Sequence, residues 1–156
     1  EELPADAYRD DVAANLAVAE RWVTEHSDTE FDFFLPPYSI LFWDKVIREG
    51  RTEAVFAAIR QAGQTLLQYD NVKFYGYLMD PEIVTNLDNY CDYIHHSGGV
   101  CREILAMLQR EEGRLTEENL EETLANWREF VVHYDYDQFW DERFWIQWNA
   151  EHAAAP

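Results

Sequence analysis

The chain has 156 residues, of which 31 are Asp or Glu and 12 are Lys or Arg, so its formal net charge is −19. A field of this sign repels phosphate backbones and anionic headgroups, which disfavours nucleic acid and membrane surfaces as partners. Hydrophobic residues make up 47% of the chain, a composition typical of a folded domain rather than a disordered segment. We therefore expect one domain over residues 1–156, with a frayed tail at 150–156.

Neither a disulfide framework nor a membrane-spanning segment is expected. Cys91 and Cys101 match no zinc-binding spacing and are expected to be free and packed. The longest uncharged run, Phe33 to Trp43, contains Pro36-Pro37 and is much shorter than the ~20 residues of a spanning helix. The chain begins at Glu1 without a basic and apolar leader, so we expect a processed chain or a piece of a longer one.

The first half of the chain predicts a helix, a strand, two helices and a second strand. Apolar residues recur at helical spacing from Asp6 to about Glu25 and again after Ser39 and Thr52, two residues suited to N-cap positions. The runs Phe31–Leu35 and Val72–Met79 are short, aromatic and nearly continuous in apolarity. This pattern is typical of parallel strands buried on both faces, and the order of elements predicts a right-handed crossover unit.

The second half predicts helical segments around a polar and aromatic loop. Asp80-Pro81 is typical of a helix N-terminus, and Gly98-Gly99 indicates a break before an apolar helical face at Val100–Leu108. Thr116 is expected to start a long helix that reaches Tyr134. We expect the aromatic residues of the tail to dock on the core, with a sugar- or partner-binding face as the alternative; they are Phe139, Trp140, Phe144, Trp145 and Trp148.

Two strands that look buried on both faces form too small a sheet to stand alone. Open edges of such a sheet invite pairing with another chain. We expect the sheet to be completed by a missing N-terminal segment or by a second copy in a homo-oligomer. The order of elements predicts half of a helix-rich α/β/α sandwich, with about two parallel strands in this chain.

The densest cluster of reactive side chains lies between Asn86 and Ser97. Within it, Asp92-x-x-His95 places a carboxylate within reach of an imidazole, which can fix the ring's tautomer and leave its second nitrogen free as a general base. The alternative is a loop aspartate that bonds to its neighbour beside a half-exposed histidine. Ser39 lacks the flanking glycines of a nucleophile elbow, and helix capping explains it better.

A metal site in the same loop is not expected, and neither is a cofactor. A closed site needs four convergent ligands, whereas the adjacent side chains of His95 and His96 are expected to point apart. The available ligand types come from the same short stretch: Asp88, Cys91, Asp92, His95 and His96.

Three stretches, 33–43, 67–72 and 83–97, resemble the C-terminal half of bacterial SGNH-type, GDSL-like hydrolases. They are similar to the D-alanyl-lipoteichoic acid biosynthesis protein group. The resemblance covers roughly Asp11 to Tyr136 and implies a flavodoxin-like three-layer sandwich, esterase or acyltransferase chemistry, and a cell-envelope location outside the cytoplasm. In that family Asp92 and His95 correspond to the catalytic Asp and His, but no Gly-Asp-Ser nucleophile motif is present in this chain.

The sequence therefore predicts the C-terminal portion of an SGNH-like acyl-ester hydrolase or acyltransferase that supplies Asp92 and His95 and is inactive in isolation. The alternative is a non-catalytic acidic domain that binds another protein or itself through its aromatic faces and open sheet edge.

Overall fold

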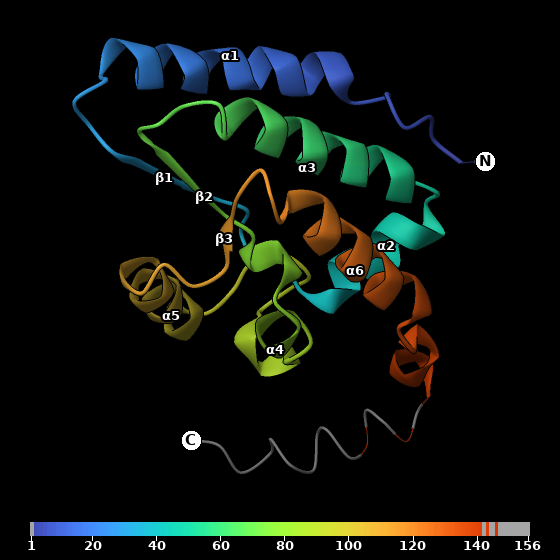
Figure 1. The fold of residues 1–156 in the computed structure, drawn as a ribbon. Coiled ribbons are helices and arrows are strands. Elements are labelled where there is room, and N and C mark those ends of the chain that lie inside the picture. Colours follow the sequence, from blue (N-terminus) through green and yellow to red (C-terminus); the bar gives the residue numbers. More distant parts are fainter. Residues whose placement is uncertain (1, 142, 144–145, 147–156) are drawn as a thin grey trace.

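The structure is a computed structural model that describes residues 2–141, 143 and 146. Its sheet has the order β1-β2-β3 and lies at the centre of the fold (Figure 1). β1 (Phe31–Phe34) and β2 (Val72–Tyr75) are parallel, as the sequence predicts. β3 (Arg114–Leu115) is antiparallel to β2. The protein is thus helix-rich α/β with a small mixed sheet, and the third strand is a correction to the two expected.

Helices make up most of the rest of the described chain. The longer helices are α1 (Arg9–Glu25), α2 (Ile40–Arg48), α3 (Thr52–Leu66), α5 (Gly98–Gln109) and α6 (Leu120–His133). Short helical turns are α4 (Pro81–Val84), η1 (Tyr77–Met79), η2 (Leu87–Asn89) and η3 (Tyr136–Trp140).

Three predicted boundaries differ from the structure. Gly98 and Gly99 form the first turn of α5 rather than a break, because the Ser97 hydroxyl accepts a hydrogen bond from the Val100 N–H and caps the helix. The segment after Tyr75 turns into η1 instead of continuing as a strand. The last long helix begins at Leu120 and not at Thr116. Before it, the side-chain oxygens of Thr116 and Asn119 each accept a hydrogen bond from the backbone N–H group of the other residue.

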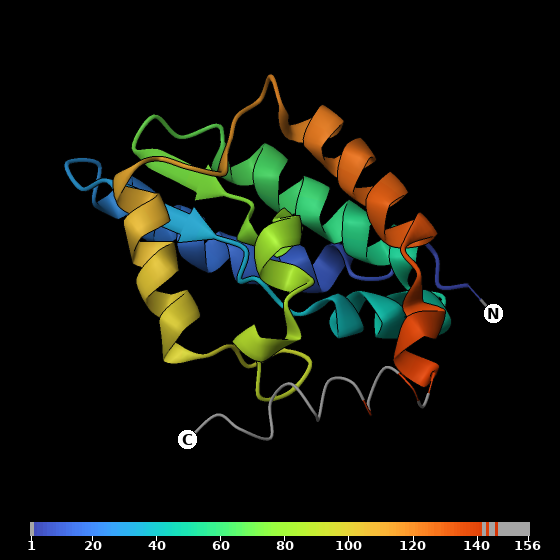
Figure 2. The same cartoon turned by 90° about the horizontal axis from the view of Figure 1, so that it is seen from below.

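The main core joins one face of the sheet to α1, α2, α3 and α6. In Figures 1 and 2, α1 and α3 run alongside one another on this side of the sheet. The centre of the core is aromatic: the Trp43 ring lies 5.3 Å from that of Phe56 and 5.9 Å from that of Trp127. A second, smaller cluster joins Tyr75 and Tyr77 to the inner side of α5 on the other face. The sheet therefore has helices on both faces, and its two faces are packed to different extents.

β1 is not buried on both faces, which corrects the sequence prediction. Phe31 and Phe33 pack against the main core, whereas Asp32 is exposed and Phe34 remains 40% exposed. The buried cluster under α5 contains Tyr75 but no side chain of β1. The second face of β1 is therefore only partly covered: the Phe34 ring lies 5.9 Å from that of Tyr77, and the rest of the side chain faces solvent. None of the helices over the described residues combines the length and apolarity needed to cross a membrane.

Candidate functional site

The loop between α4 and α5 is held as a tight hairpin by its own backbone. Tyr90 pairs with His96 in an isolated antiparallel bridge. The Ser97 N–H donates to the Asn89 carbonyl at 2.7 Å, and the Cys91 N–H donates to the His95 carbonyl at 3.0 Å. These bonds fix the backbone that carries the residues singled out in the sequence.

Asp92 and His95 are paired within this hairpin. The Asp92 Oδ2 atom lies 2.6 Å from His95 Nδ1, and Asp92 Oδ1 accepts hydrogen bonds from the N–H groups of Ile94 and His95 at 2.8 and 2.7 Å. The two backbone donors, followed by the imidazole, lower the pKa of Asp92 to about 2. The Asp92 and His95 side chains are 46% and 69% exposed. A catalytic role for this open pair stays a prediction.

Ser39 has no access to that pair. It is fully buried, and its hydroxyl donates to the Tyr93 carbonyl at 2.9 Å. It occupies the N-cap position of α2 without a side-chain capping bond, so the predicted capping role is wrong. The hydroxyl instead anchors the hairpin to the start of α2. A hollow of about 240 Å³ lies beside it, lined in part by Leu87, Tyr90 and Asp92.

The two cysteines are free but exposed, which corrects the expectation that they are packed. The Cys101 Sγ atom lies 3.6 Å from His96 Nδ1, and the Cys91 thiol donates to the His95 carbonyl at 3.3 Å. His96 therefore turns toward α5 while His95 turns toward Asp92. Over the described residues, no three His, Cys, Asp or Glu side chains gather closely enough to hold a metal ion.

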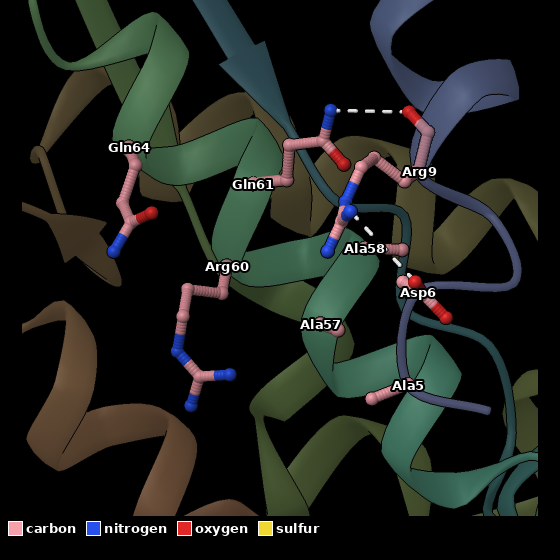
Figure 3. Close-up of a pocket in the computed structure, with 8 residues that line it drawn as sticks. All are labelled: Ala5, Asp6, Arg9, Ala57, Ala58, Arg60, Gln61 and Gln64. Atoms are coloured by element: carbon pink, nitrogen blue, oxygen red, sulfur yellow. Dashed lines mark hydrogen bonds and ion pairs between the residues drawn. The ribbon is translucent and has the colours of Figure 1, made fainter.

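A hollow of about 510 Å³ lies between α3 and the start of α1 (Figure 3). Ala5, Ala57 and Ala58 contribute small side chains to its wall, and Arg9 and Arg60 lie at its rim. The polar groups of this groove already have partners. Arg9 Nη1 lies 3.7 Å from Asp6 Oδ2, and Gln61 donates to the Arg9 carbonyl.

Arg60 is also paired, since its Nε atom contacts both carboxylate oxygens of Glu121 at 2.9 Å. The groove is therefore an open hollow between helices, and its charged side chains are already paired with opposite charges. The sequence carries no signal for this groove, because alanines in a helix predict only close packing of helices.

The open edge of β1 is a third candidate, because over the described residues no strand pairs with this side of its backbone. The N–H groups of Phe31 and Leu35 donate to β2 at the Asn71 and Tyr75 carbonyls, both at 2.9 Å. In a parallel ladder the intervening residues face the other way, so the N–H and C=O groups of Asp32 and Phe34 point to the open side. Over the described residues β1 pairs with β2 alone.

Comparison with known proteins gives weak similarity to two bacterial relatives. Both are named UPF0735 ACT domain-containing protein, one from Lacticaseibacillus casei (strain BL23) and one from Lacticaseibacillus paracasei (strain ATCC 334). Each is 24% identical over 90 residues, which cover 58% of this chain and 62% of the relative. The match thus spans less than two thirds of the relatives' length. No family model and no solved structure matches the chain.

These relatives overturn the resemblance to SGNH-type, GDSL-like hydrolases. They are named for an ACT domain and not for an esterase or acyltransferase, so the expected hydrolase or acyltransferase function is wrong. Short stretches such as the one around Asp92 and His95 recur by chance in unrelated chains, which is why a local motif misled the assignment. The non-catalytic alternative agrees better with the relatives.

Proposed function

We propose that this chain is a non-catalytic, acidic protein-interaction domain that accepts an extended segment of a partner protein at the open edge of β1. The observation that carries this proposal is the outward-facing backbone of Asp32 and Phe34, beside a Phe34 ring that is 40% exposed. An added strand satisfies such N–H and C=O groups and gains affinity from main-chain hydrogen bonds.

The edge is held rigidly enough to act as a template. The rings of Phe31 and Phe33 lie 6.1 Å apart and pack on the main core, while the register with β2 runs through all four residues of β1. A partner strand therefore meets a preformed surface. Binding costs little free energy for ordering β1, because β1 is already ordered.

The same proposal accounts for the small size of the sheet. A strand added beside β1 enlarges a sheet that already has α1 and α3 on one face and α5 on the other. The relatives, named for a domain and not for a reaction, support a non-catalytic role.

The proposal is tested with Asp32→Pro, which removes one of the two outward N–H groups of β1. Proline is tolerated on an edge strand where that group faces solvent, so the variant is expected to keep the fold. Asp32→Ala is the matched control, because it also loses the carboxylate but keeps the N–H donor. Eight-residue peptides are selected from a displayed library on the immobilised chain, and their affinities for both variants are measured.

We expect the selected peptides to bind Asp32→Pro at least about tenfold more weakly than Asp32→Ala, because one main-chain hydrogen bond is lost and the carbonyl of the peptide is left without a donor. Hydrogen exchange of the Asp32 and Phe34 amides should slow in the wild-type complex. Equal affinity for the two variants, with unchanged exchange at these amides, would contradict strand addition at β1.

A further inference from the structure

We infer that the segment accepted by β1 is basic: it places a Lys or Arg side chain beside Asp32, on the sheet face that also carries Glu30 and Lys73. The inference rests on the proposed function and names the chemistry of the partner. It follows from a row of charges that crosses this face of the sheet.

The row alternates in sign from β1 toward β3. Lys73 Nζ lies 2.9 Å from Glu30 Oε1 and 2.7 Å from Glu111 Oε1. Glu111 Oε2 in turn lies 2.8 Å from Arg114 Nη1. Opposite charges on adjacent strands stabilise their pairing, and like charges oppose it. The order of signs is thus negative, positive, negative, positive.

At the open edge this row ends in acidic side chains. Asp32 lies opposite Lys73 in the register of β1 and β2 and is exposed. The Lys73 ammonium is already shared by Glu30 and Glu111, and over the described residues the Asp32 carboxylate forms no ion pair. Continuing the alternation by one strand requires a cation next to Asp32.

A second copy of the chain does not meet this requirement. Pairing of two β1 strands brings the same acidic pair, Glu30 and Asp32, from both sides onto one short ladder, and each chain carries a formal charge of −19. Like-charge contact at that edge opposes self-association.

The other face of β1, formed by Phe31 and Phe33, is partly buried against the core. It favours apolar neighbours, so the partner segment alternates apolar and basic residues.

The test uses two synthetic pentapeptides with blocked ends, Val-Lys-Val-Lys-Val and Val-Glu-Val-Glu-Val, titrated into the full chain at 20 mM salt. Backbone amide shifts of residues 31–34 report binding at the edge. We expect the lysine peptide to bind at least about fivefold more tightly than the glutamate peptide, since a favourable cross-strand pair is replaced by a repulsive one.

Two charge variants separate the local effect from the overall field. Asp32→Lys should reverse the preference and favour the glutamate peptide. Asp10→Lys makes the same change in net charge at an exposed position in the first turn of α1, and it should leave the preference for lysine in place. If Asp10→Lys reduces the preference as much as Asp32→Lys, a basic residue beside Asp32 is ruled out.

The remaining outcomes also discriminate. Equal binding of both peptides at residues 31–34 overturns the basic partner and leaves strand addition standing. Sedimentation as a dimer that Asp32→Pro dissociates, with no peptide bound, means that a second copy occupies the edge and overturns the inference. A monomer whose residues 31–34 respond to neither peptide contradicts both the inference and the proposed function.

Discussion

Asp92 organises the loop between α4 and α5 through a single carboxylate. One oxygen accepts two backbone N–H groups and the other contacts the His95 ring at 2.6 Å. Ser39 supports the same loop from outside, since its N–H and its hydroxyl both donate to the Tyr93 carbonyl. The pair of Asp92 and His95 is therefore explained by local structure, whatever further role the loop has.

The pKa of Asp92, lowered to about 2 in the folded chain, makes this loop sensitive to acid. A carboxyl group with a depressed pKa contributes stability above its unfolded value near ~3.9, and that contribution is lost as the pH falls through the folded value. We expect the protection of the Ile94 and His95 amides, which is their exchange rate relative to that of an unstructured chain at the same pH, to decrease as the pH falls from about 4 to about 2. The measurement is hydrogen exchange followed by NMR across that range.

Asp92→Asn supplies the control for this acid response. Its side-chain carbonyl still accepts a hydrogen bond, but it has no charge to lose, so the loss of protection in acid should disappear. A carboxyl titration in which Asp92 has a midpoint near an unperturbed aspartate would show that the hydrogen bonds to Ile94 and His95 are not formed in solution.

The packing of α3 on α6 shows which forces hold the elements together. A Cβ atom at Gly63 would lie 2.8 Å from Leu120 Cδ2, so the Leu120 side chain packs directly over this glycine and would have to shift for a larger residue. Leu124 is 1% exposed at this interface. The helices are also joined at the surface by Arg128 and Glu53, whose Nη2 and Oε1 atoms lie 2.6 Å apart.

Leu124→Ala should destabilise the chain by about 3 kcal/mol, because truncation of a buried leucine loses transfer free energy and leaves a cavity. Arg128→Ala should cost less than about 1 kcal/mol, since an exposed ion pair is screened by water and salt. Urea unfolding of the two variants measures both effects on the same helix pair. Comparable losses would mean that the ion pair is more important than its exposure indicates.

At the scale of the whole molecule, the charge of −19 opposes compactness. Acidic residues strongly outnumber basic ones. Much of the positive charge is therefore already engaged in ion pairs, such as those of Lys73 with Glu30 and Glu111. The remaining carboxylates repel one another over a distance set by salt. The same repulsion acts between copies of the chain.

Raising the NaCl concentration from 10 to 150 mM should raise the melting temperature of the chain. The Debye length shortens from about 30 to about 8 Å, which screens repulsion between distant carboxylates more than contacts below 4 Å. Thermal unfolding by circular dichroism measures the change, and Asp10→Lys should show a smaller rise. A melting temperature that falls with salt would show that attractive ion pairs outweigh the repulsion.

The amino-acid sequence by itself determined the elements whose signals are local. Helical periodicity located α1, α2 and α3, and two aromatic runs located the parallel strands β1 and β2. Asp80 caps α4 ahead of Pro81, as its sequence indicates. The contact between Asp92 and His95 was predictable for the same reason, because three residues of separation and a tight turn bring the groups together.

Tertiary structure decided the features that depend on distant partners. β3 has two residues, too few for a pattern, and exists because Leu115 and Arg114 lie opposite Phe74 and Tyr75. The Ser39 hydroxyl meets a carbonyl 54 positions away instead of capping its own helix.

The outer side of β1 is the clearest case. Apolarity indicated burial on both faces, but α5 packs over Tyr75 and leaves Phe34 exposed. Sequence patterns report which residues prefer burial, whereas the docking of helices decides which faces are covered, because packing depends on contacts far apart in the chain.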